Sequence, residues 1–188
     1  MKPTTLAFAL TLLAAPAAQA MDGSQMKSYF DANIAPWMGS QVLVDAIVAQ
    51  NAVTGGYDAA QIDALDQTWR AEVGSGSTPT IDAVLNNAAA DFLRDQVAAA
   101  GGAITEVFIM DGQGLNVAAS GVTSDYWQGD EAKFQETYPM GAGTLHFSEI
   151  EFDESSQTYQ AQISVTLTDG TGAVIGAMTV GVNADALM

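Results

Sequence analysis

The sequence predicts an α+β fold in which long N-terminal helices pack on a five-stranded antiparallel sheet. Apolar residues recur at helical spacing through the first half of the mature chain, residues 21–102. In the second half, residues 103–188, the spacing changes to the two-residue period of strands, and glycine-containing turns separate the strand segments. Helices that precede the strands, rather than alternate with them, are typical of α+β proteins.

Local signals place three helices in the first half. Asp58 and Gln61 have the spacing of a capping box, which marks a helix start. Asp66 lies four residues before Arg70, a spacing that allows an ion pair on one helix face. Thr78 is a candidate N-cap, because a proline follows it at the first helical position. The expected helices cover residues 41–53, 58–73 and 79–100.

The clearest strand pattern lies near the C-terminus. Over residues 159–168, apolar residues alternate with glutamine, serine and threonine, so this strand has one apolar face and one polar face. Turns at Asp111–Gly114 and Asp169–Gly172 predict two antiparallel hairpins. A short helix with flanking loops is expected over 124–138. The five expected strands are 104–110, 115–120, 144–152, 159–168 and 173–182.

The N-terminus has the features of a secretory signal peptide. Lys2 precedes an apolar run over residues 6–15, and Ala18-Gln19-Ala20 matches the small-x-small pattern of a cleavage site. The run is too short for a membrane-spanning helix, which needs about 20 apolar residues. We therefore expect removal of residues 1–20 and a mature protein, residues 21–188, that forms one domain in the periplasm or outside the cell.

The composition excludes several classes of function. The chain has 22 acidic and 5 basic residues and a formal net charge of −17, which argues against binding to nucleic acid or to an anionic membrane. The charge fits two alternatives, which are attraction of cationic ligands and a surface adapted to salty water. The absence of cysteine excludes disulfides, thiolate metal sites and cysteine nucleophiles.

Three segments of the second half occur in an order that resembles a known family. They read FIMDGQGLNVAAS, TSDYWQGDEAKF and FDESSQTYQAQISVTLTDGTGAVIGAMTVGVNAD. Together with the preceding helices, they resemble the Cache family, the PAS-like extracytoplasmic sensor domains of bacterial chemoreceptors and histidine kinases. The resemblance implies a PAS-like sheet with a ligand on the face opposite the long helix. It also implies a membrane receptor or a histidine kinase as the signalling partner.

The resemblance further implies a site with an aromatic roof and a polar floor. Apolar rings would enclose a small polar molecule, and a few polar groups would orient it. Aromatic faces beside carboxylates would suit a cationic amine. The alternatives are that the rings only pack in the core and that the polar strand face is solvated. The candidate ligand-binding residues are Tyr126, Trp127, Asp130 and Phe134 in the roof, Gln162 and Ser164 in the floor, and His146 on the neighbouring strand.

The leading hypothesis is a free-standing sensor module that is not an enzyme and needs no cofactor. The alternative is a structural or interaction protein with a vestigial pocket, which would dock on a receptor or dimerise through its N-terminal helices. A hydrolase is disfavoured because His146 is the only histidine and no nucleophile-elbow motif accompanies it. No metal site is expected, because the acidic run Glu149, Glu151, Asp153 and Glu154 lacks the calcium-loop spacing.

Overall fold

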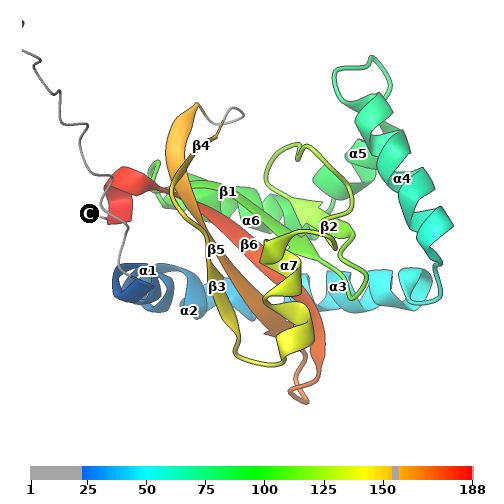
Figure 1. Cartoon of the computed structure of the whole chain (residues 1–188). Helices are drawn as coiled ribbons and strands as arrows, with labels where there is room; N and C mark the ends of the chain where they lie inside the picture. Colours follow the sequence, from blue (N-terminus) through cyan, green and yellow to red (C-terminus); the bar gives the residue numbers. More distant parts are fainter. Residues whose placement is uncertain (1–22, 154–156, 188) are drawn as a thin grey trace, which may run out of the picture.

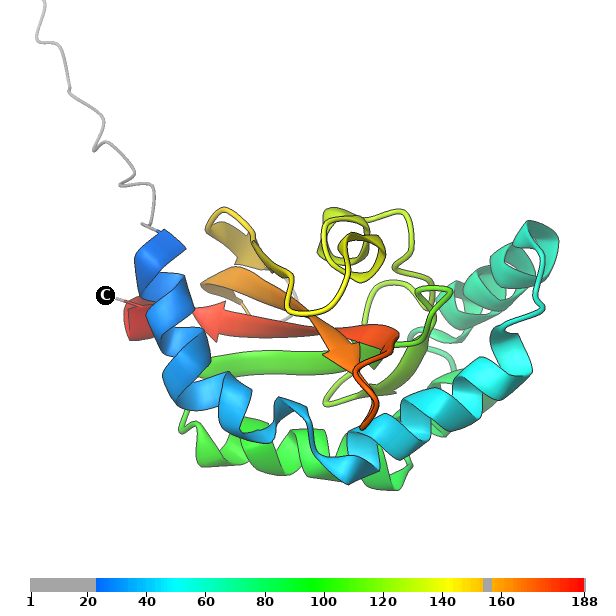
Figure 2. The same cartoon turned by 90° about the horizontal axis from the view of Figure 1, so that it is seen from below.

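The α+β class expected from the sequence is confirmed. The computed structural model describes residues 23–153 and 157–187, so the expected signal peptide and Glu154 lie outside the described residues. Within these ranges, an antiparallel sheet carries long helices on one face and a short helical segment on the other (Figures 1 and 2). No helix in the described part of the chain is long and apolar enough to cross a membrane.

The sheet has the strand order β2-β1-β6-β5-β3, and β4 also pairs with β5. Its long central strands are β5 and β6, which pair antiparallel along most of their length. The strands are β1 (Ile104–Met110), β2 (Asn116–Ala119), β3 (Leu145–Phe147), β4 (Glu151–Asp153), β5 (Thr158–Thr168) and β6 (Val174–Asn183).

The single strand expected over 144–152 is instead two short strands on one edge of the sheet. β3 pairs with residues 163–165 and β4 with residues 158–160. At the break, the Ser148 hydroxyl accepts a hydrogen bond from Gln162 N at 2.8 Å, while Ser148 N donates to Gln162 O at 2.9 Å. A side chain thus takes the place of a backbone carbonyl, which interrupts the ladder without leaving Gln162 N unpaired.

The long helices form the layer below the sheet in Figure 2. The N-terminal part of this layer continues from α1 through a π-helical turn, Phe30–Ile34, into α2. Two 3-10 turns, Tyr138–Met140 and Ala184–Leu187, lie elsewhere in the chain. The helices are α1 (Gly23–Tyr29), α2 (Ala35–Met38), α3 (Gln41–Thr54), α4 (Ala59–Glu72), α5 (Pro79–Leu85), α6 (Ala88–Ala99) and α7 (Ala132–Gln135).

The third expected helix is divided into α5 and α6 at Asn87. The Asn87 side chain accepts from Ala90 N at 2.9 Å and so caps α6. Its amide nitrogen donates to the carbonyl oxygens of Ala83 and Val84, both at 3.0 Å, and satisfies the end of α5. One asparagine therefore ends one helix and begins the next.

The other expected helix signals have mixed outcomes. The capping box of Asp58 and Gln61 is present, with both of its hydrogen bonds formed. Thr78 makes no capping hydrogen bond. The buried Glu72 carboxylate instead accepts from Thr80 N at 2.8 Å and Ile81 N at 3.0 Å at the start of α5.

The main core lies between the helices and one face of the sheet. The apolar residues of the β5 alternation, among them Ile163 and Val165, point into it and are fully or almost fully buried. The polar face of β5 is covered as well, because Ser164 and Thr166 are at most 1% exposed. The alternative in which this face is solvated is therefore wrong for these two residues.

Candidate ligand-binding site

The sheet face opposite the long helices carries a row of side chains in which buried hydroxyl groups lie between His146 and Phe108. His146 on β3 lies opposite Ser164 on β5, and Ser164 lies opposite Thr179 on β6. The hydroxyl oxygens of Ser164 and Thr179 are 3.0 Å apart and share a hydrogen bond. Phe108 on β1 continues the row. Cross-strand partners point to the same side of a sheet, so these four side chains line one surface.

A second polar cluster lies beside this row, around Gly181. Gln160 accepts a hydrogen bond from the Thr105 hydroxyl, and its amide nitrogen donates to Glu106 Oε1 at 3.1 Å. The amide nitrogen of Gln162 donates to the same oxygen at 3.3 Å. The cluster therefore fixes one carboxylate with two amide donors.

Gly181 is required by this cluster. A Cβ at this position would approach Thr105 Oγ1 to 2.5 Å, Glu106 Cγ to 2.8 Å and Gln160 Oε1 to 2.9 Å. A register shift between Ile104 and Glu106 brings two β1 side chains to this place. The missing side chain of Gly181 makes room for them.

The short helix α7 contributes the roof of the site. Lys133 Nζ lies 5.3 Å from the centroid of the Phe108 ring and 3.0 Å from Glu131 Oε2. Its side chain is only 15% exposed, so the ammonium group is held close to the sheet. Phe134 is buried and stacks on Tyr138 with 5.0 Å between the ring centroids. α7 thus presents one cation and one apolar patch to the sheet.

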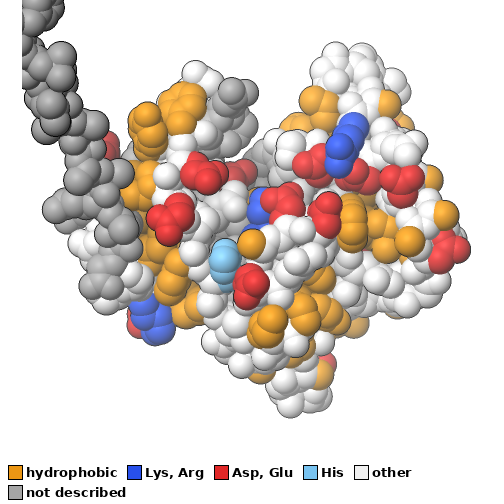
Figure 3. Space-filling view, viewed as in Figure 1, with side chains coloured by type: hydrophobic (Ala, Val, Ile, Leu, Met, Phe, Trp, Pro, Cys, Tyr) orange, Lys and Arg blue, Asp and Glu red, His pale blue; other side chains and the backbone are white. Residues whose placement is uncertain are grey.

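A hollow of about 230 Å³ opens between α7 and the β4 edge of the sheet. Acidic side chains gather on this face of the molecule, between the end that carries β4 and the end that carries α4 and α5 (Figure 3). The lining is mostly polar and contains three carboxylates, one ammonium group and two amides. It comprises Glu131, Lys133, Ser148, Glu149, Glu151, Phe152, Gln160 and Gln162.

Four of the seven residues expected in the site lie on this side of the molecule. Gln162 lines the hollow, and Ser164 and His146 lie in the adjacent row of the sheet. Ser164 is fully buried and His146 is half-buried. Phe134 belongs to the roof helix.

The other three residues do not line the hollow. Tyr126 is buried and stacks on Trp69 of α4, with 5.4 Å between the ring centroids. The indole nitrogen of Trp127 donates to Gln113 O at 2.8 Å. Asp130 is exposed to solvent. Tyr126 and Trp127 therefore form an aromatic part of the expected roof that packs on α4 and shares one apolar cluster with Phe134, rather than lining the hollow.

The aromatic part is held by Asp66 of α4. One oxygen of this buried carboxylate accepts from Tyr126 N at 2.9 Å and from Trp127 N at 3.0 Å. The other oxygen lies 2.8 Å from Arg70, which also contacts Asp125 at 2.9 Å. The expected Asp66–Arg70 pair is thus confirmed, and it positions the segment around Tyr126.

Sequence reasoning missed Lys133, Glu106 and Gln160. Lys133 could have been found, because it is the only Lys or Arg after Arg94 in the chain. Glu106 and Gln160 are 54 residues apart, and only their pairing through the sheet makes them neighbours. No local pattern contains that information.

Two buried side-chain oxygens, Oδ1 of Asn116 on β2 and the hydroxyl oxygen of Thr166, have no hydrogen-bond partner among the described residues. Thr166 is 1% exposed and lies on the same face of β5 as Ser164, so its hydroxyl is on the covered face. Buried polar groups almost always find a partner, so a polar ligand group or water would satisfy these oxygens.

Within residues 23–153 and 157–187, no group of three His, Cys, Asp or Glu side chains could hold a metal ion.

Comparisons with known proteins give a similarity of fold to sensor domains. The chain matches no protein-family model and no curated protein. It is similar in structure to the sensor domain of the V. cholerae histidine kinase DctB, with 16% identity and a TM-score of 0.46, over 88% of this chain and 53% of that chain.

Two other solved structures are similar at the same level. The ligand-binding domain of the Campylobacter jejuni chemoreceptor Tlp3, in complex with 4-methylisoleucine, is 12% identical with a TM-score of 0.44, over 88% of this chain and 64% of that chain. An extracellular ligand binding receptor from Desulfohalobium retbaense is 13% identical with a TM-score of 0.41, over 80% of this chain and 26% of that chain. This chain therefore spans less than two thirds of the length of each.

Proposed function

We propose that this chain is an extracytoplasmic sensor module that binds a small polar molecule carrying a cationic amine in the hollow between α7 and β4. The observation that supports the proposal best is the position of the hollow. It opens beside a buried polar sheet face and under a roof helix that contributes both Glu131 and Lys133.

The chemistry of the lining favours an amine. Glu131, Glu149 and Glu151 outnumber the one cation, Lys133, so the hollow attracts positive charge. The Gln160 and Gln162 side chains could orient a neutral polar group of the same ligand. A volume of about 230 Å³ is smaller than the roughly 300–1,000 Å³ of sites for drug-sized molecules, which favours a small metabolite.

The position of the hollow also provides a route to signalling. One wall belongs to α7 and the other to β4 and β5, so an occupant would contact both. Suppose that the protein has two conformations that differ in the position of α7. A ligand that binds more tightly to one conformation increases its population, and a ligand that binds both equally produces no signal. A membrane receptor or histidine kinase would detect this shift.

Export to the periplasm or beyond belongs to the same proposal. It rests on the N-terminal pattern of residues 1–20, and it predicts that the protein recovered from the periplasm of an expressing bacterium begins at Met21. Intact-mass measurement of that fraction checks the prediction. A protein that retains Met1 would contradict export by cleavage.

A thermal-shift screen of the mature chain, residues 21–188, tests ligand binding. The panel contains amines, amino acids, small carboxylates and nucleobases. A ligand at 100 times its Kd adds about 2.7 kcal/mol of stability and raises the melting temperature. We expect an amine-containing compound to give the shift, and we expect Gln162→Ala to abolish it. Lys133→Ala should strengthen it, because this change removes the one cation of the lining that repels the amine.

Three variants make the screen specific. Lys27→Ala is the matched control, because Lys27 is an exposed lysine on α1 that pairs with Asp31. Trp127→Ala and Asp130→Ala test the residues that the sequence places in the roof. A shift that survives Gln162→Ala but is lost in these two would place the ligand near α4 and contradict the α7 hollow.

The alternative, an interaction protein, is favoured by one exposed aromatic pair. Phe152 on β4 and Tyr159 on β5 pack edge to face with 5.3 Å between centroids, and they are 48% and 63% exposed. Two results together would support this function. A broad screen would find no stabilising compound, and the protein would bind a receptor in an interaction that Tyr159→Ser abolishes. A homodimer through the N-terminal helices stays a prediction, which light scattering of the purified protein checks.

A further inference from the structure

The one cation that lines the hollow under α7 is the ammonium group of Lys133. Its Nζ lies 3.0 Å from Glu131 Oε2 and 5.3 Å from the centroid of the Phe108 ring. A carboxylate and the face of an aromatic ring are both favourable partners of an ammonium group. Glu131 and Phe108 therefore form an ammonium subsite, and Lys133 occupies it in this structure.

The lysine side chain lies between the hollow and the aromatic ring. Phe108 is 2% exposed, and the Lys133 side chain, which covers its face, is 15% exposed. Lys133 also lines the hollow, so the subsite continues the space that a ligand enters. An ammonium group that approaches Phe108 from the hollow therefore meets the Lys133 side chain.

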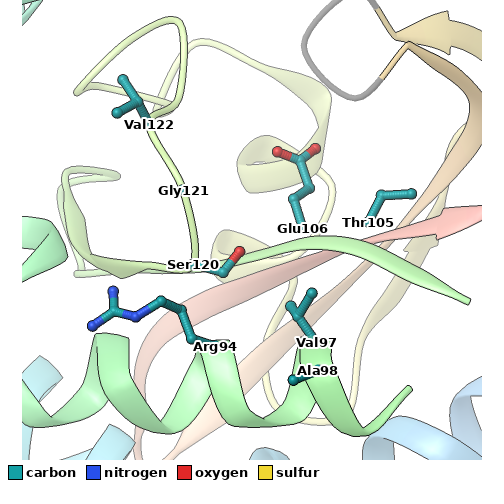
Figure 4. Close-up of a pocket in the computed structure, with 8 residues that line it drawn as sticks. All are labelled: Arg94, Val97, Ala98, Thr105, Glu106, Ser120, Gly121 and Val122. Carbon is teal, nitrogen blue, oxygen red and sulfur yellow. The ribbon is translucent and has the colours of Figure 1, made fainter. Parts of the chain in front are cut away.

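A fourth carboxylate, that of Glu106, lies beside the three that line the hollow. In Figure 4 it points to the side of β1 away from Val97 and Ala98 of α6. Its Oε1 accepts from the side-chain amides of Gln160 and Gln162, which both line the hollow. The negative charge around the hollow therefore comes from β1 as well as from α7 and the β4 edge.

We infer that Lys133 is an internal competitor for the ammonium subsite. A ligand ammonium group binds between Glu131 and Phe108 and displaces the lysine side chain into solvent, because two ammonium groups side by side repel each other. The inference rests on the proposed function and adds to it the position of the ligand's ammonium group. The displacement removes a contact between α7 and β1, so it couples occupancy of the hollow to the position of α7.

Titration of the mature chain with n-butylammonium chloride tests the competition, because this cation has the four carbons and the ammonium group of a lysine side chain. A site that is open for only about one tenth of the time binds about tenfold more weakly than a site that is always open. We therefore expect Lys133→Ala to bind the probe about tenfold more tightly than the wild type. Glu131→Gln in the Lys133→Ala background should reverse this gain, because it removes the carboxylate of the subsite.

Lys27→Ala is the matched control for this titration. Lys27 also pairs with a carboxylate, that of Asp31, and lies 6.0 Å from the centroid of the Phe30 ring, but its side chain is exposed on α1. Each variant removes one positive charge, so the general attraction of cations to this acidic protein increases by a similar amount in both. Only Lys133→Ala empties the subsite.

NMR spectra of protein labelled with ¹³C at the lysine Cε atoms follow the displacement directly and need no variant. Residues 21–188 contain only two lysines, Lys27 and Lys133, so each signal is assigned from the spectrum of one alanine variant. In the free protein, the ring current of Phe108 shifts the Lys133 signal from its ordinary position. We expect n-butylammonium to move this signal to the position of a solvent-exposed lysine and to leave the Lys27 signal unchanged.

Two outcomes would overturn the competition and leave the hollow as an amine site. In the first, saturable shifts at residues 148–151 show binding, while Lys133→Ala and Lys27→Ala have equal affinities. In the second, Lys133→Ala binds more tightly but the Lys133 signal of the wild type does not move. The lysine would then repel the probe without leaving its position.

The remaining outcomes bear on the proposed function as well. No saturable binding to either the wild type or Lys133→Ala would contradict an amine site in the hollow, and the inference would fail with it. Binding to Lys133→Ala alone would support the inference, because the lysine would then exclude the probe from the wild type.

Discussion

At the scale of single residues, glycine shows how closely the sheet is packed. Gly176 on β6 lies against the backbone of β1, and a Cβ there would approach Met110 O to 2.1 Å. A backbone oxygen held within the sheet cannot move aside as a flexible side chain can. Gly170 in the β5–β6 turn is the opposite case, because a Cβ there meets nothing within 4 Å.

We therefore expect Gly176→Ala to destabilise the protein by about 1–3 kcal/mol, the usual cost of overpacking a core. Gly170→Ala is the matched control and should change the free energy of unfolding by less than about 0.5 kcal/mol. Urea unfolding of both variants measures these changes. Equal stabilities of the two variants would show that β1 and β6 can separate to admit a methyl group.

Tyr126 gives a prediction on pH. Burial, with smaller contributions from the charges of Asp111 and Tyr57, raises the pKa of Tyr126 to about 12 from its ordinary value of 10. The unfolded chain ionises this phenol near pH 10, whereas the folded chain keeps it neutral until about pH 12. The free energy of unfolding should therefore fall through this window, by about 2–3 kcal/mol in total.

Urea unfolding of the wild type and Tyr126→Phe between pH 8 and pH 12 checks this. The stability difference between the two proteins should be constant below about pH 9. Above about pH 10, the wild type should lose stability relative to the variant, because only the wild type has this phenol. A difference that stays constant up to about pH 12 would mean that the Tyr126 phenol ionises equally easily in both states.

At the scale of elements, α4 is attached to the loop after β2 by one carboxylate. Asp66 accepts two backbone N–H groups from that loop, at Tyr126 and Trp127, and pairs with Arg70. Removing an acceptor from buried donors costs about 1–3 kcal/mol, and more when the acceptor is charged. Asp66→Ala should therefore lower stability by at least that amount and accelerate amide exchange at Tyr126 and Trp127.

Asp63→Ala is the control for this prediction. Asp63 is also on α4, but it is exposed, and its carboxylate accepts a hydrogen bond from the side chain of Gln67 at 2.7 Å. Its removal should leave both the stability and the exchange rates nearly unchanged. Hydrogen exchange followed by NMR separates local loosening of the loop from global unfolding. Unchanged exchange in Asp66→Ala would mean that the Trp69–Tyr126 stack alone holds the loop.

The elements that the sequence predicts well are those with a local signal. The β5 alternation predicts a strand because each residue carries its own preference for one face, and the observed β5, Thr158–Thr168, agrees with it. The Asp58 capping box is another local signal that is confirmed. The break at Ser148 is different, because it depends on a hydrogen bond to Gln162 across the sheet.

The candidate site also contains residues that a local pattern predicts and residues whose position depends on tertiary contacts. Gln162 could be predicted from the polar face of β5, and it lines the hollow under α7. Tyr126 and Trp127 could be recognised as an aromatic pair, but their position depends on Asp66, 60 and 61 residues earlier in the chain. Their role in ligand binding stays a prediction. Sequence spacing indicates which residues can bind a ligand, and tertiary contacts decide which of them share a site.

At the scale of the whole molecule, negative charge dominates the electrostatics. The formal net charge is −17, and it becomes one unit more negative if the expected cleavage removes Lys2. Like charges repel one another in the compact state more than in the expanded unfolded chain, so this charge opposes folding. Dissolved salt weakens the repulsion, because the screening length falls from about 30 Å at 0.01 M to about 8 Å at 0.15 M.

We therefore expect sodium chloride to raise the melting temperature over this range, by about 2–4 °C for each kcal/mol of repulsion that it removes. A matched variant replaces three exposed carboxylates by amides, with Asp63→Asn, Glu136→Gln and Asp185→Asn. It should melt higher than the wild type at low salt and respond less to added salt, because less repulsion is left to screen. Calorimetry of both proteins at the two salt concentrations measures the effect. A melting temperature that falls with salt would show that ion pairs such as Arg70–Asp66 outweigh the net repulsion.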